Sequence, residues 1–418
     1  MSYTPIFNMA AVALTLAAVF GYVNHRWMRL PHTIGLVIIA LVVSLAVLGL
    51  DALVPELGFQ PALRDALDRI DLHETLMKGM LSFLLFAGAL HVDLDDLLGR
   101  KWAIGAMATG GVLISTVLVG VAVWGVVGLV GLDIPLVYCL VFGALISPTD
   151  PVAVLGILKT LEVPETLKAK IAGESLFNDG VGVVVFTLLV AIAAGGEAGE
   201  AMTALSVAKL FVQEAVGGAL LGLAGGYLCY RTMKTIDEHN LEVLITLALV
   251  TLTYSIALTI HVSGPIAVVV AGLLIGNHGS RLAMSETTRD HVEKFWSLLD
   301  EVLNSVLFLI IGFEVVALTL SGAIALLMAI AVPLVIAARF ISVATPLGLL
   351  GLRRSFTKGA IPVLTWGGLR GGISVALALS LPDIPAKEAI LAATYAVVIF
   401  SIVVQGLTVK KVVEATVR

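Results

Sequence analysis

The sequence predicts an all-α polytopic membrane protein. Of its 418 residues, 59% are hydrophobic and 13% are charged, whereas ordinary soluble domains carry about 25% charged residues. Uncharged runs such as 34–50 and 112–130 approach the ~20 residues that cross a bilayer as a helix. We therefore expect one membrane unit over residues 1–418 without a soluble domain.

Apolar runs give about 13 expected transmembrane helices. Each run ends where charged residues, or proline and glycine, interrupt it. In chain order the approximate ranges are 5–23, 32–50, 74–92, 103–130, 134–158, 170–194, 203–230, 240–260, 263–277, 295–319, 321–350, 358–381 and 386–410. The first of these lacks the pattern of a cleaved leader, so we expect it to be retained as a span.

The basic residues support this number of helices. Loops after odd-numbered helices, with the C-terminal tail, hold 18 of the 25 lysines and arginines, and loops after even-numbered helices hold 5. Cytoplasmic loops carry the excess of basic residues. We therefore expect the N-terminus outside and the C-terminus in the cytoplasm, in a prokaryotic inner membrane.

Two helix breaks are expected inside the apolar ranges. In the fifth range two prolines bracket Thr149 and Asp150, and in the twelfth four glycines surround Arg370. Proline removes a backbone donor and glycine weakens a helix, and the freed carbonyls are tolerated in a membrane only inside protein or beside a water-filled cavity. The breaks lie seven helices apart, so their helices run in opposite directions, as inverted-repeat transporters require.

Acidic and polar residues at the head of the sixth range indicate an ion site. Asp179 and Ser175 are one turn apart on one helix face, and we expect both to converge with Asp150. Carboxylates, the Thr149 hydroxyl and freed carbonyls would form a hard-oxygen site for a small alkali cation. Asn178 either lines that site or makes an ordinary interhelical hydrogen bond. A buried acid is costly and therefore indicates function; static ion pairs or helix caps are the alternative.

Glu174 also needs a partner at membrane depth. We expect Arg370 to neutralise it, because an unpaired guanidinium in a membrane is unfavourable. Arg339, inside the eleventh range, is a second candidate. We interpret the Glu174–Arg370 pair as structural, organising the ion site rather than binding the ion.

The motifs together resemble those of bacterial NhaP-type sodium/proton antiporters of the monovalent cation:proton antiporter-1 family. The resemblance rests on residues 149–151, 174–180 and 368–372, with further likeness at 83–86, 93–94 and 264–272. It implies a 13-helix fold with inverted repeats and two crossed, unwound helices. It also implies a homodimer that works by an elevator-like movement. The core elements would be about 74–194 and 295–381, and the dimerisation elements about 1–50 and 203–277.

The resemblance also assigns roles to residues. Asp179 would be the essential carboxylate that alternately holds cation and proton, and Glu174 would pair with Arg370. The other residues that it places in the ion site are Asp150, Thr149 and Ser175. The Asn178–Asp179 pair matches the electroneutral branch of the family.

The expected function is exchange of Na⁺, or also Li⁺, for H⁺ at 1:1 stoichiometry, which serves pH homeostasis. A K⁺/H⁺ or mixed-cation antiporter is the alternative on the same scaffold, and a cation channel or a membrane sensor is the alternative from another class. With two cysteines and no nucleotide or metal motif, we expect no enzyme activity and no cofactor. The expected partners are monovalent cations, protons, the lipid bilayer and a second copy of the chain, not nucleic acid.

Overall fold

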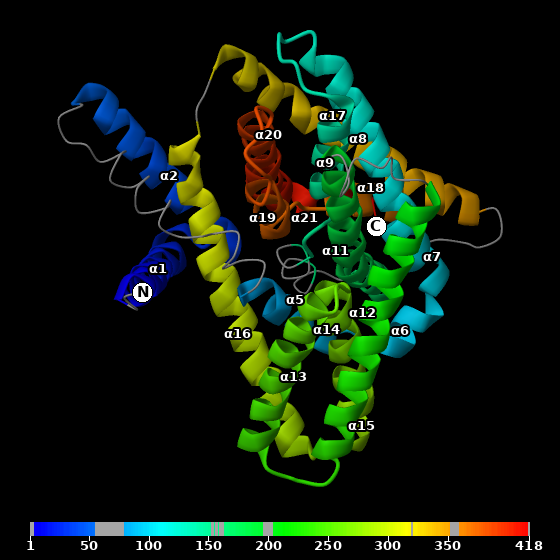
Figure 1. Cartoon of the computed structure of the whole chain (residues 1–418). Helices are drawn as coiled ribbons and strands as arrows, with labels where there is room; N and C mark the ends of the chain where they lie inside the picture. The colour runs from blue at the N-terminus through cyan, green and yellow to red at the C-terminus, as the bar shows by residue number, and fades with distance from the viewer. Residues whose placement is uncertain are drawn as a thin grey trace.

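The computed structural model contains only helices as regular elements within the residues that it describes, which confirms the predicted all-α class. The described residues are 4–54, 79–151, 154, 158, 163–194, 204–318, 321–351 and 359–416. Figure 1 shows α1 and α2 at one side of the molecule and α6, α7 and α8 at the opposite side. Between them lie α9, α11, α19 and α20, so the central elements include both predicted break regions.

The helices overlap the predicted ranges, although some of their ends differ by several residues. The longer ones are α1 (Thr4–Val23), α2 (His32–Leu53), α8 (Val112–Val127), α11 (Glu165–Ala193), α12 (Ala204–Met233), α13 (His239–Thr259), α16 (Glu286–Phe313) and α17 (Gly322–Gly351). The shorter ones are α5 (Leu81–Leu90), α6 (Leu94–Gly99), α7 (Lys101–Gly105), α9 (Leu136–Ile146), α14 (Gly264–Leu274), α15 (Ser280–Leu282), α18 (Ala360–Trp366), α19 (Gly372–Leu379), α20 (Lys387–Phe400) and α21 (Gly406–Thr416).

Short π-helical turns join some of these helices into longer spans. Ala106–Gly111 connects α7 to α8, Ile275–Gly279 connects α14 to α15, and Ser401–Gln405 connects α20 to α21. A fourth π turn, Asn24–Met28, follows α1, and a 3-10 turn, Glu314–Ala317, follows α16. Such π turns occur frequently at functional sites.

Seven helical spans in the described residues are long and apolar enough to cross a membrane. They are His32–Asp51, Lys101–Val127, Thr166–Ala193, His239–Thr259, Gly264–Leu282, Gly322–Gly351 and Lys387–Thr416. The apolar helices α5 and α9 are shorter. The total of 13 membrane crossings therefore stays a prediction.

Close helix packing in a membrane depends on small residues. The hydrophobic effect does not hold helices together in lipid, so they associate through close van der Waals contact, which small residues allow. At Gly143 of α9 an added Cβ would collide with the Thr116 carbonyl of α8. At Gly222 of α12 it would collide with the Ala267 carbonyl of α14. The helices of both pairs also contact α11, so these two close approaches help to fix the helix that carries the candidate site.

The backbone is non-helical at 147–151 and at 367–371, where the sequence predicted breaks. Most of residues 152–162 lie outside the described part of the chain. The crossing of two unwound helices therefore stays a prediction.

Candidate functional site

The first break follows directly from proline. Helix α9 ends at Ile146, and Pro148 cannot donate the hydrogen bond that would continue it. The Ser147 hydroxyl donates to the Gly143 carbonyl at 2.6 Å and lies 2.8 Å from the Ser115 hydroxyl of α8. The end of α9 is therefore anchored to its neighbour, and the chain leaves it in a fixed direction.

The second break meets the first through backbone groups. The Asp150 N–H donates to the Leu369 carbonyl at 2.8 Å, which joins the two non-helical segments. The Arg370 N–H donates to the Ser401 hydroxyl at 2.9 Å. Ser401 was not predicted as a site residue; its signal was a hydroxyl within an otherwise apolar run.

The Arg370 guanidinium covers the end of α9. It is buried, and Nη1 donates to the carbonyls of Ser147 and of Pro148, the latter at 2.9 Å. The C-terminal end of a helix carries unsatisfied carbonyls and a partial negative charge. Arg370, in the second break, thus supplies a positive charge to the first break.

The predicted partner of Glu174 was wrong. Arg339 of α17, the second candidate, makes a two-pronged ion pair with it: Nη2 lies 2.9 Å from Oε2, and Nη1 contacts Oε1. Arg339 also donates to the Leu364 carbonyl at 3.1 Å from Nη2. Gly368 leaves room for the Arg339 guanidinium, because a Cβ there would lie 2.6 Å from Nε. Arg370 instead donates to carbonyls of the first break. The sequence indicated two arginines at membrane depth, but it did not indicate which of them faces α11.

Three polar side chains on α11 and the first break form a hydrogen-bonded cluster. The Thr149 hydroxyl lies 2.9 Å from the Ser175 hydroxyl and accepts from Asn178 Nδ2 at 2.8 Å. The Thr149 N–H donates to Asn178 Oδ1 at 3.3 Å. Ser175 and Asn178 are three residues apart, so both face the break from one side of α11. The structure thus brings together three polar residues that the sequence singled out, Thr149, Ser175 and Asn178.

Asp179 follows this cluster on α11. It is 6% exposed, and within the described residues no hydrogen bond reaches its carboxylate. Asp150 is close enough to act on it electrostatically. A carboxylate close to a second one is harder to ionise when it is buried, so Asp179 gains by binding a positive ligand. The arrangement can therefore hold a cation or a proton.

Comparisons with known proteins agree with this architecture. Residues 14–415 match the model of the family described as sodium/hydrogen exchanger, transmembrane. The chain is 48% identical over 417 residues to the Na⁺/H⁺ antiporter NhaP of Pseudomonas aeruginosa, covering 97% of this chain and 96% of that protein. It is 33% identical to the Na⁺/H⁺ antiporter NhaH of Halobacillus dabanensis, covering 99% of this chain and 97% of that protein.

The fold has a counterpart among solved structures. The sodium proton antiporter MjNhaP1 of Methanocaldococcus jannaschii superposes with a TM-score of 0.76 at 18% identity, over 98% of this chain and 97% of that one. The fold and the polar helix breaks thus define an integral membrane protein of the antiporter class. The chain belongs to the sodium/hydrogen exchanger family, which confirms the resemblance found in its motifs.

Proposed function

We propose that the chain exchanges a monovalent cation, Na⁺ in the first place and Li⁺ as a second substrate, for H⁺ across the membrane. The observation that carries this proposal is the buried Asp179 carboxylate beside the cluster of Thr149, Ser175 and Asn178. Relatives that share 48% and 33% of their residues with the chain are named Na⁺/H⁺ antiporters, which supports the choice of ions.

The chemistry is competition for one carboxylate. An ionised, unpartnered Asp179 is too costly to carry through the membrane interior, so it crosses only after binding a proton or a cation. Asp150, hydroxyl oxygens and carbonyls at the breaks would replace the water that Na⁺ gives up, because hard cations prefer oxygen ligands. Because Asp179 cannot hold both ligands at once, loading on one side and unloading on the other gives exchange.

Alternating access would come from an elevator-like movement within a homodimer. The core elements, about 74–194 and 295–381, would move against the dimerisation elements, about 1–50 and 203–277. The placement of the site supports this division, since α9, α11 and both breaks all fall within the core ranges. The hydrogen bond from Asp150 to Leu369 and the contacts of Arg370 join these pieces, so the site could travel as one body.

The orientation follows from the basic residues. We place the N-terminus outside and the C-terminus in the cytoplasm of a prokaryotic inner membrane, where the exchange would serve pH homeostasis. We expect no enzymatic step and no bound cofactor, because the two ion gradients supply the driving force.

The test is dequenching of a pH-sensitive dye in everted vesicles after addition of Na⁺, Li⁺ or K⁺. We expect Na⁺ to release protons in the wild type and not in Asp179→Asn, whose amide cannot exchange a proton. Asp290→Asn is the matched control, because Asp290 is an exposed acid on α16 that pairs with Lys294 at 2.6 Å, away from the candidate site. The control should transport normally.

Each other outcome has a definite meaning. A response to K⁺ that exceeds the response to Na⁺ would make the chain a K⁺/H⁺ or mixed-cation antiporter. Absence of cation-dependent proton movement in the wild type would contradict antiport and favour a channel or a sensor. Full activity in Asp179→Asn would exclude Asp179 as the shared binding group.

A further inference from the structure

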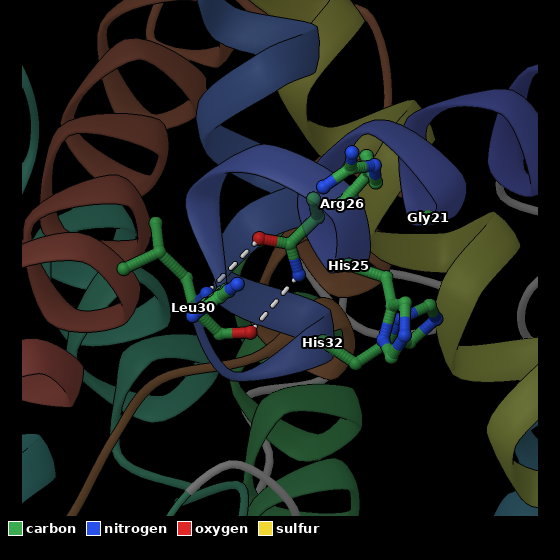
Figure 2. Close-up of a pocket in the computed structure, with 7 residues that line it drawn as sticks. Gly21, His25, Arg26, Leu30 and His32 are labelled. Atoms are coloured by element: carbon green, nitrogen blue, oxygen red, sulfur yellow. Dashed lines mark hydrogen bonds between the residues drawn. The ribbon is translucent and has the colours of Figure 1, made fainter.

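The turn between α1 and α2 is a fixed structure rather than a loose loop. The buried Asn24 amide binds Leu30 in both directions: it donates to the Leu30 carbonyl at 2.9 Å and accepts from its N–H at 3.2 Å (Figure 2). Arg29 adopts a left-handed conformation with φ of 55°, and its N–H donates to the Asn24 carbonyl at 2.7 Å. A non-glycine residue in that conformation is uncommon and often marks a functional site.

This turn borders an open pocket of about 490 Å³ lined by basic side chains. His25, Arg26, Arg29 and His32 line it, and no acidic residue does. Within the described part of the chain, no carboxylate lies within ion-pair distance of Arg26 or Arg29. Among the described residues, the pocket therefore carries a net positive charge that no carboxylate neutralises.

Neighbouring helices hold one wall of the pocket in place. His32 Nε2 lies 2.8 Å from the Ser305 hydroxyl of α16. Gly21 leaves space for the same imidazole, since a Cβ there would lie 3.1 Å from His32 Cε1. The wall is thus set before any ligand arrives, which lowers the ordering cost of binding.

Two exposed aromatic side chains beside the pocket are of the kind found at the depth of lipid headgroups. Tyr22 and Trp27 are 63% and 66% exposed, and their rings meet edge to face with centroids 6.1 Å apart. Tryptophan and tyrosine gather at membrane–water interfaces. Both residues lie beside the pocket in sequence, at the end of the apolar helix α1, a position where they would lie level with the phosphate groups of lipids.

We propose that this pocket binds the phosphate of an anionic phospholipid headgroup. Guanidinium groups bind phosphate oxygens in pairs of parallel hydrogen bonds, and basic pockets between membrane helices suit anionic headgroups. The volume falls within the range of small-molecule sites. This inference goes beyond ion exchange: the pocket lies outside the α9–α11 site and does not depend on it.

The test is native mass spectrometry of the delipidated, detergent-purified protein with added phosphatidylglycerol or phosphatidylcholine. We expect the wild type to retain phosphatidylglycerol in preference to phosphatidylcholine. The variant Arg26→Ala/Arg29→Asn should bind it roughly tenfold more weakly or worse, since each basic residue contributes to the attraction. Asparagine tolerates the left-handed turn at residue 29, and a thermal unfolding curve equal to that of the wild type confirms folding.

A matched control removes the same charge elsewhere. Arg231→Ala/Lys234→Ala changes two exposed basic residues at the end of α12 and should leave lipid retention unchanged. Equal retention by the pocket variant and the wild type, or equal binding of the two lipids by the wild type, would overturn the proposal. Competition by inorganic phosphate as strong as that by the lipid would overturn the lipid assignment in favour of a free anion. Because binding is measured without ion gradients, these outcomes are independent of the transport assay.

Discussion

Two buried arginines at the centre of the molecule have different electrostatic tasks. Arg339 neutralises the carboxylate of Glu174, and Arg370 supplies its charge to the carbonyls of Ser147 and Pro148. The α9 end has no intrahelical donors for those carbonyls, because its helix stops at a proline. A guanidinium satisfies two carbonyls with one planar group, which lysine could not do in the same geometry.

The corrected pairing can be tested by a double-mutant cycle. Glu174→Gln or Arg339→Gln alone should cost about 3–5 kcal/mol of unfolding free energy, because each leaves a buried charge without its partner. The double variant should cost less than the sum of the two. Thermal unfolding of the purified protein in detergent measures these changes.

Arg370 provides the comparison for that cycle. The coupling of Glu174→Gln with Arg370→Gln should be smaller than that of Glu174→Gln with Arg339→Gln, because Glu174 acts on Arg370 electrostatically but makes its ion pair with Arg339. A larger coupling of Glu174 with Arg370 than with Arg339 would restore the pair predicted from the sequence and contradict the geometry.

At the scale of the elements, the sequence predicted the positions of both breaks but not their contacts. Pro148 ends α9 locally, and the glycines of 367–371 have little helix propensity, so composition alone located these segments. The bond from the Asp150 N–H to the Leu369 carbonyl joins residues more than two hundred positions apart. Such a pairing depends on how distant helices pack against each other, and a local sequence pattern does not predict that packing.

The close fit of the two breaks predicts that Gly371 cannot accept a side chain. A Cβ at this position would lie 2.6 Å from the Asp150 Cβ and 2.8 Å from its Cγ. Gly371→Ala should therefore displace Asp150, reduce Na⁺-dependent proton movement, and cost about 1–3 kcal/mol of unfolding free energy through overpacking. The dye assay and thermal unfolding measure the two effects.

Gly348 of α17 is the matched control, since nothing lies within 4 Å of a Cβ built there. Gly348→Ala should keep full activity and stabilise the helix by about 0.5–1 kcal/mol. Wild-type transport in Gly371→Ala would mean that the position of Asp150 is not critical for the ion site.

Over the whole molecule, hydropathy located the membrane helices better than their ends. Helix α16 begins at Glu286, nine residues before the predicted start at 295, and its first turns carry Arg289, Asp290 and Lys294. A helix can continue into water through turns that carry charged residues. The length of an apolar run therefore predicts the part of a helix that lies in lipid, not the full length of the helix. The candidate site was predictable because buried acids are rare; the partner of Glu174 was not, because two arginines met the same criterion.

Electroneutral exchange makes a prediction for the whole transporter. If Asp179 crosses the membrane holding either H⁺ or Na⁺, its charge is the same in both directions, and a membrane potential does no work on the cycle. In proteoliposomes the Na⁺ ratio at equilibrium should then follow the proton ratio alone. A net charge moved per cycle would instead contribute about 2.3 kcal/mol per 100 mV, which would shift the Na⁺ ratio roughly 50-fold.

The measurement clamps the potential with K⁺ and valinomycin while the internal pH is followed, with Asp179→Asn vesicles as the control for leakage. An equilibrium that moves with the imposed potential would reject 1:1 exchange.

The same preparation tests competition: lowering the pH should raise the apparent KM for Na⁺ and leave the maximal rate at saturating Na⁺ unchanged, because protons and Na⁺ compete for Asp179. A KM independent of pH would instead show that proton and cation bind at separate groups, and would remove Asp179 as the single carboxylate that both ligands share.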